Sequence, residues 1–237
     1  MEAQKPLGGH CTVRSLGRHH KFHDRRDLSD EGLRSLRGVR ARMEHDEKST
    51  KEGPFILDIK KIRQRAREHI EKGAVTPEYR SNRAEVVRIL NEALATEIVC
   101  VLRYKRHQYM AAGINAIPVA SEFAQHAAEE QGHADMIAAR ITQLDGEPNF
   151  NPEGLLTRAH SEYKEGKSLV EMIQEDLIAE RIAIDTYAEI IRYLGDNDST
   201  SRLMMEKILS MEEEHAEDMK TLLQKVGSDK KLASHQG

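Results

Sequence analysis

Tryptophan is absent from this chain of 237 residues, and aromatic side chains make up only 4% of it. Cysteine is scarce as well, because only Cys11 and Cys100 occur and neither belongs to a Cys-x-x-Cys pattern. These absences argue against a disulfide framework and against a thiolate metal site. Few aromatics together with 32% charged residues are typical of a helical protein with much solvated surface.

Long apolar runs are also missing, since no segment approaches the roughly 20 residues that span a bilayer. The N-terminus lacks the apolar segment of a secretory signal, so Arg25-Arg26 alone does not indicate export. We therefore expect a cytoplasmic protein without a membrane partner. A net charge of -4 and a pI near 6.3 give no general attraction to nucleic acid.

The first 53 residues show little helical periodicity and are predicted to form a flexible, basic and histidine-rich tail. Eleven basic against eight acidic side chains give residues 1–50 a net charge of +3, and five histidines occur there. A solvated tail is the main expectation, and contact with the phosphates of DNA is the alternative. Translation from Met43 would remove residues 1–42, which the sequence leaves open.

A short amphipathic helix followed by a linker is predicted over residues 54–81. Pro54 suits the first turn of a helix, and Gly73 suits its end. Between them, apolar side chains repeat at helical spacing: Phe55, Ile59, Ile62, Ala66 and Ile70. This helix is expected to lie on the rest of the molecule or to meet another subunit.

Four longer helical segments occupy residues 82–227, and residues 228–237 are predicted to be a flexible C-terminal tail. Capping boxes at Asn82 and Ser168, Pro118 in a first turn, and glycines as stops give their limits. The segments are Asn82–Gly113, Pro118–Gly146, Ser168–Gly195 and Ser199–Gly227. Only the second link is long, at roughly 20 polar residues, which permits a crossover. The fold class is therefore all-α, a four-helix bundle with one long crossover.

Each of these four segments carries a glutamate in the middle of its apolar stripe, and two of the glutamates are followed three residues later by a histidine. Burying a carboxylate costs several kcal/mol unless a cation or hydrogen bond compensates it. Mid-helix positions stay at one level whichever way a helix points, so the side chains should meet. The predicted metal and catalytic residues are Glu97, Glu130, His133, Glu180, Glu212 and His215.

The ligand set repeats internally, because 33 residues separate Glu97 from Glu130 and 32 separate Glu180 from Glu212. Two equivalent metal positions are expected from this repeat. Four carboxylates and two imidazoles suit iron or manganese, and zinc would bind as well. Other residues near the stripes receive lesser roles. Tyr104 lies close enough to donate a hydrogen bond to a ligand, and ordinary packing is the alternative. The glutamates beside the stripes are expected to be solvated, with an ion path along His126 and Glu129 as the alternative: Glu129, Glu213 and Glu214. The methionines of the fourth segment are expected to fill the core: Met204, Met205, Met211 and Met219.

The chain resembles the bacterioferritins, a ferritin-like di-iron carboxylate family, over about residues 82–226. The likeness rests on four motifs: Ala95-Thr-Glu-Ile-Val-Cys-Val-Leu-Arg-Tyr104, Glu130-Gln-Gly-His-Ala-Asp135, Asp176-Leu-Ile-Ala-Glu180 and Glu212-Glu-Glu-His215. The resemblance implies that Glu130 and Glu212 bridge two irons, that Glu97 and Glu180 are terminal carboxylates, and that His133 and His215 complete the two sites. Fe(II) oxidation by dioxygen or peroxide and storage in a homo-oligomeric shell are implied too. Bacterioferritins bind haem through a methionine where this chain has Gln131, so haem is not expected.

Three functions remain open from the sequence. The first is a ferroxidase serving iron storage or detoxification. The second is a mini-ferritin of the Dps type that binds and protects DNA, and its DNA binding would weaken with salt. The third is a non-catalytic helical assembly module that zinc stabilises through the inward carboxylates.

Overall fold

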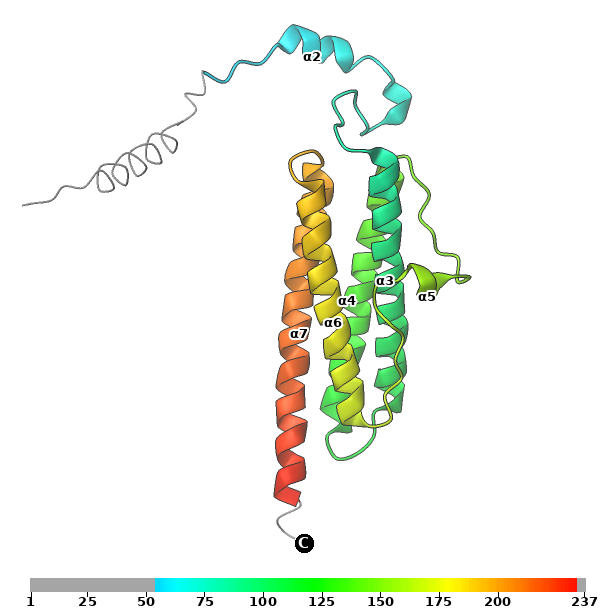
Figure 1. Ribbon diagram of the computed structural model, residues 1–237, viewed down its shortest axis with the longest axis vertical. Helices are drawn as coiled ribbons and strands as arrows, with labels where there is room; N and C mark the ends of the chain where they lie inside the picture. Colours follow the sequence, from blue (N-terminus) through cyan, green and yellow to red (C-terminus); the bar gives the residue numbers. More distant parts are fainter. Residues whose placement is uncertain (1–53, 234–237) are drawn as a thin grey trace, which may run out of the picture. The chain divides into compact units, whose positions relative to one another are not determined.

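The computed structural model describes the backbone of residues 54–233 and the side chains of residues 54–226. The chain divides into two units, Met1–Leu57 and Asp58–Gly237, and every helix described here belongs to the second. Four long helices of this unit lie side by side (Figure 1). They are α3 (Arg83–Met110), α4 (Ala116–Gln143), α6 (Leu169–Leu194) and α7 (Ser199–Ala233). The described residues form no strand, so the predicted all-α class is confirmed.

The predicted N-caps of α3 and α6 are both present. Asn82 Oδ1 accepts the Glu85 N–H at 3.3 Å, and Ser168 Oγ accepts the Glu171 N–H at 3.3 Å. Each satisfies one of the N–H groups that have no partner within the helix. The reciprocal half of the predicted capping boxes is not formed, because Glu85 pairs with Arg88 and Glu171 accepts from the N–H of Lys167.

The C-terminal ends follow glycine less closely than the sequence predicts. At the end of α4 the left-handed residue is Asp145, with φ of 59°, and not Gly146. Gly146 is needed for space instead, because a Cβ there would lie 2.7 Å from Cγ1 of Val87 on α3. The fourth helix does not end at Gly227 but continues to Ala233, so the predicted tail over residues 228–237 begins too early. Residues 234–237 lie outside the described part.

A long crossover joins α4 to α6 and runs along the bundle (Figure 1). It contains α5 (Leu155–Arg158), a single turn that the sequence did not reveal. Arg103 on α3 fastens it by donating to Glu162 O at 3.0 Å and to Asp176 Oδ1 on α6 at 2.8 Å. Within the Asp58–Gly237 unit, α3 packs mainly on α4 and α6 mainly on α7, as two hairpins connected by this crossover. The predicted topology is therefore confirmed.

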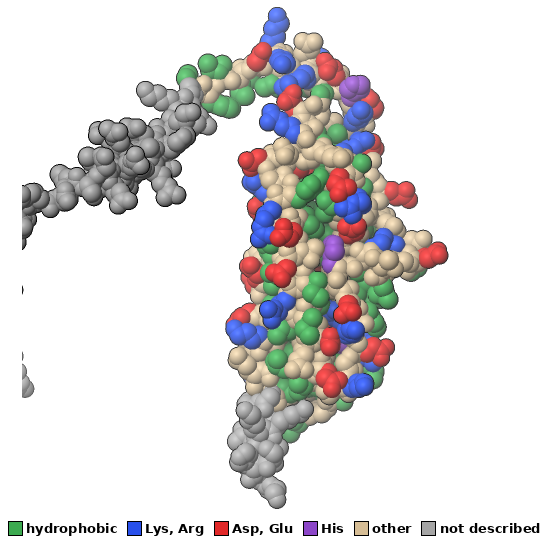
Figure 2. Space-filling model, viewed as in Figure 1, with side chains coloured by type: hydrophobic (Ala, Val, Ile, Leu, Met, Phe, Trp, Pro, Cys, Tyr) green, Lys and Arg blue, Asp and Glu red, His purple; other side chains and the backbone are tan. Residues whose placement is uncertain are grey.

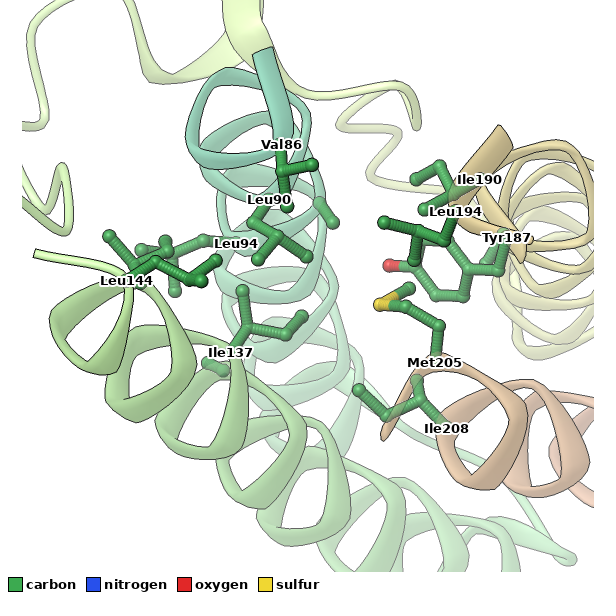
Figure 3. Close-up of a cluster of buried hydrophobic side chains, with 14 residues drawn as sticks. Val86, Leu90, Leu94, Ile137, Leu144, Tyr187, Ile190, Leu194, Met205 and Ile208 are labelled. Atoms are coloured by element: carbon green, nitrogen blue, oxygen red, sulfur yellow. The ribbon is translucent and has the colours of Figure 1, made fainter. Parts of the chain in front are cut away.

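Two separate apolar clusters fill the bundle. The first includes Leu90 and Leu94 of α3, Ile137 of α4, Tyr187 of α6, and Met205 and Ile208 of α7, whose side chains converge between the helices (Figure 3). The second gathers Tyr104, Val119, Phe123, Ile173 and Met219, among others. Burying each such side chain stabilises the fold by about 1.5–3 kcal/mol. The stability that these two clusters supply offsets the cost of burying the charged side chains that lie between them.

The segment before the bundle forms less helix than the sequence predicts. Helix α2 (Ile59–Arg65) begins after Asp58, whose side chain accepts the Lys61 N–H, and not at Pro54. A 3₁₀ turn, η1 (Ile70–Lys72), precedes Gly73. The apolar side chains here are exposed, with Phe55 at 88% and Ile62 at 39%. The tail predicted over residues 1–53 lies outside the described residues, and no helix among those described is long and apolar enough to cross a membrane.

Candidate metal centre

The six side chains that the sequence predicts as ligands all meet in the middle of the bundle. Glu97 comes from α3, Glu130 and His133 from α4, Glu180 from α6, and Glu212 and His215 from α7, and each is at most 4% exposed. In each helix the glutamate separates residues of the first apolar cluster from residues of the second. The carboxylates are therefore enclosed by apolar layers on both sides.

The ligand atoms fall into two overlapping groups, each of which could hold one ion. One consists of Glu97, Glu130, His133 and Glu212, and the other of Glu130, Glu180, Glu212 and His215. Within each group the atoms lie within 4.8 Å of one another. Glu130 and Glu212 belong to both groups and so stand between the two positions.

Both histidines direct Nδ1 toward this pair of glutamates. His133 Nδ1 lies 3.4 Å from Glu130 Oε2, 3.0 Å from Glu212 Oε1 and 3.5 Å from Glu97 Oε2. His215 Nδ1 lies 3.4 Å from Glu130 Oε1 and 3.5 Å from Glu212 Oε2. Each histidine therefore faces both shared carboxylates.

Most of these buried ligand atoms have no hydrogen-bond partner. They are both carboxylate oxygens of Glu130 and of Glu212, Oε2 of Glu180, and Nδ1 of His133 and of His215. An unpartnered buried polar atom costs about 1–3 kcal/mol, and more where the group is charged. Seven such atoms at one place fit a site that two cations complete.

The protein without metal balances this charge with protons. Burial, reinforced by Glu212 and Glu130, raises the pKa of Glu97 well above its usual value, and burial with the same two neighbours raises the pKa of Glu180. Burial opposes protonation of the histidines, but the surrounding carboxylates outweigh it and raise the pKa of His133 to about 12 and that of His215 to about 11. Glu130 is also buried, yet Glu97 and the two histidines hold its pKa far below the usual range.

A tyrosine from the opposite hairpin orients each unshared glutamate. Tyr104 on α3 donates to Glu180 Oε1 on α6, and Tyr187 on α6 donates to Glu97 Oε1 on α3. The first contact agrees with the sequence-based expectation, whereas the role of Tyr187 was missed. The internal repeat contained the signal, because Tyr187 follows Glu180 by seven residues just as Tyr104 follows Glu97.

The sequence predicts a solvated Glu129, but in the structure its side chain also contacts a histidine. Its Oε2 lies 3.0 Å from Nε2 of His215, and its side chain is 30% exposed. A carboxylate on the far nitrogen of a metal-binding histidine fixes the ring and its tautomer. Glu213 and Glu214 are exposed, as expected. Of the methionines on α7, Met205 and Met219 are fully buried and Met204 and Met211 are partly buried.

A family model described as the ferritin-like domain matches residues 87–228, which is more than half of the chain. The chain belongs to the ferritin-like family. The resemblance that the four motifs indicate is thereby confirmed.

This ferritin-like chain is similar to several known proteins. Bacterioferritin from Mycobacterium leprae (strain TN) is 32% identical over 144 residues, which cover 60% of this chain and 86% of the relative. The dodecameric thioferritin of Bacteroides fragilis, a bacterioferritin-related protein, has a TM-score of 0.62 at 29% identity, over 64% of this chain and 92% of that one. A ferritin-like di-iron carboxylate protein from Bacillus anthracis str. Ames has a TM-score of 0.54 at 25% identity, over 60% and 99%.

Proposed function

We propose that this ferritin-like protein is a ferroxidase that takes two Fe(II) ions as substrate at the paired site and oxidises them to Fe(III). The observation that carries the proposal is the overlap of two four-residue groups that share Glu130 and Glu212. Two Fe(II) ions together give up two electrons, which with two protons convert one hydrogen peroxide into two waters, or one dioxygen into hydrogen peroxide. Two adjacent ions are what such a two-electron reduction requires.

The donor set of the two positions suits iron. Each position offers carboxylate oxygens and one imidazole nitrogen, a combination that suits iron and manganese and also accepts zinc. In this assignment Glu130 and Glu212 bridge, Glu97 with His133 completes one position, and Glu180 with His215 completes the other. The two tyrosines hold the terminal carboxylates, and Glu129 holds His215.

Storage of the ferric product in a homo-oligomer is the second part of the proposal. The similarity to bacterioferritins and to a dodecameric bacterioferritin-related protein supports it.

Location in the cytoplasm, the lack of haem at Gln131 and DNA contact by residues 1–53 stay predictions. On the bundle face seen in Figure 2, acidic and basic side chains are interspersed, so the described surface offers no broad basic area to DNA there.

The test follows Fe(II) oxidation directly. Protein without metal is mixed anaerobically with increasing Fe(II), oxygen is admitted, and the near-ultraviolet absorbance of the ferric product is recorded. We expect a fast phase that saturates at about two irons per chain and disappears in Glu130→Ala and His133→Ala, because these substitutions remove donors at both positions or at one.

Glu213→Gln is the matched control, since Glu213 adjoins Glu212 but is exposed. It should keep the fast phase. Fast oxidation at the wild-type rate in Glu130→Ala contradicts the proposal. If the wild type shows no fast phase, while zinc raises its melting temperature and Glu130→Ala abolishes that rise, the site is structural instead.

A further inference from the structure

Three polar side chains that bind no metal are buried where α3 meets α6. Arg103 and His107 come from α3 and Asp176 from α6, and each is at most 1% exposed. Arg103 Nε donates to Asp176 Oδ1 at 2.8 Å, and His107 Nδ1 lies 2.8 Å from Asp176 Oδ2. Both oxygens of the Asp176 carboxylate are therefore engaged from α3. We call these three residues the α3–α6 triad.

The α3–α6 triad also holds the last part of the crossover. Arg103 Nη1 donates to Glu162 O at 3.0 Å. His107 Nε2 lies 3.1 Å from Lys164 O and 3.0 Å from Glu165 O. The two hairpins and the segment that connects them are therefore joined at one buried point.

The internal repeat shows that packing α3 against α6 does not require charged side chains. Asp176 precedes the metal-site glutamate of its helix by four residues, as Ala93 does on α3. His107 follows the glutamate of its helix by ten residues, as Ile190 does on α6. Ala93 and Ile190 both belong to the first apolar cluster, at 0% and 6% exposure. On the other side of the paired site, the equivalent positions are therefore apolar.

A buried ion pair is weak evidence for stability, because apolar residues of similar volume often replace one without loss. Its best-attested use is to specify register, since a shifted arrangement leaves the buried charges unpaired. Register matters at this boundary. Arg103 adjoins Tyr104, which donates to Glu180 on α6. Asp176 lies one turn before Glu180, and a shift of α6 by one turn, about 5.4 Å, would break both contacts.

We propose that the α3–α6 triad fixes the register of the two hairpins and thereby positions Glu97 and Glu180 for the metal pair. The three residues touch no metal and act through the hydrogen bonds of Tyr104 and Tyr187, so they are positioning residues. Their effect on metal binding rests on the proposed function, whereas their effect on register does not. Apolar replacement of the whole triad should therefore preserve the fold and disturb the site.

The triple variant Arg103→Met, His107→Leu, Asp176→Leu tests this separation in the full chain. In the crystal structure of its metal-free form, we expect the Tyr104 hydroxyl to lie beyond hydrogen-bond distance of Glu180. Calorimetric titration should show Zn(II) binding about tenfold weaker than in the wild type. Lys105→Met, an exposed position of the same helix, is the control and should match the wild type in both respects.

Urea unfolding of the metal-free protein distinguishes register from stability. Asp176→Asn leaves two buried donors of α3 without their carboxylate, so it should unfold at a lower urea concentration than the triple variant. An equal or reversed order would show that the charges stabilise the fold, and would overturn the proposal.

The triple variant also overturns the proposal if it retains the Tyr104 hydrogen bond to Glu180 and the wild-type Zn(II) affinity. Because the crystal structure reads the register without metal, a wild type that binds no Zn(II) at Glu130 and Glu212 contradicts the proposed function alone.

Discussion

Tyr104 and Tyr187 each donate a hydrogen bond across the two hairpins to a terminal carboxylate. The orientation of Glu180 and Glu97 therefore depends on residues that bind no metal. Replacing Tyr187 by Phe leaves Oε1 of buried Glu97 without its donor. We expect Tyr187→Phe to weaken metal binding about tenfold and to lower the free energy of unfolding of the metal-free protein by about 1–2 kcal/mol. Calorimetric titration with Zn(II) and urea unfolding measure the two effects. Tyr193→Phe, on the same helix but 49% exposed, is the control, and equal behaviour of the two variants would exclude an orienting role.

The same residues show what periodicity can predict at this scale. Glu97, Glu130, Glu180 and Glu212 could be identified because a helical stripe leaves a buried carboxylate only one direction in which to point. The contact between Glu129 and His215 could not, since the two residues are 86 positions apart and Glu129 lies off the stripe. Its role depends on how closely α4 and α7 approach, which one helix does not encode.

At the scale of helices, alanine should change the free energy of unfolding in opposite directions at two glycines, one inside α4 and one just after it. A Cβ at Gly146, just after α4, would lie 2.7 Å and 2.8 Å from the two Cγ atoms of Val87, a stiff β-branched side chain. We expect Gly146→Ala to destabilise the protein by about 1–3 kcal/mol. Gly132, inside α4, has no atom within 4 Å of its Cβ position, so Gly132→Ala should stabilise by about 0.5–1 kcal/mol. Urea unfolding of the metal-free protein measures both, and a shared sign would contradict this account.

Helix starts were predicted better than helix ends for a related reason. The caps at Asn82 and Ser168 need only a side chain and an N–H three residues away, so local sequence specifies them. An end depends on what the next turn packs against. Gly227 therefore does not stop α7, and α2 ends at Arg65 and not at Gly73, although both glycines fit local stop patterns.

At the scale of the whole molecule, the protons of the metal-free centre link metal binding to pH. Glu97, Glu180, His133 and His215 all have raised pKa values, with His133 at about 12 and His215 at about 11. Near neutral pH the two histidines hold protons that two divalent cations must displace, and the raised pKa values of Glu97 and Glu180 favour protons on these carboxyls as well. We expect release of up to about four protons per pair of ions. Titration with Zn(II) in buffers of different ionisation enthalpy measures that number, and a release near zero would contradict the charge balance described above.

The same raised pKa values set the sign of the effect on stability. A group whose pKa rises on folding stabilises the native state fully below its unfolded pKa, and this contribution is lost as pH rises through the folded pKa. For the two histidines the loss begins near their unfolded value of about 6.5, so the metal-free centre becomes less stable from about pH 6 to about pH 8. Binding of ions strengthens over that interval because fewer protons compete.

The rise in melting temperature on adding Zn(II) should therefore be larger at the higher pH. Scanning calorimetry measures it, with Glu130→Ala as the control that should lose the pH-dependent part; a rise that shrinks with pH in the wild type would show that the four groups do not hold these protons.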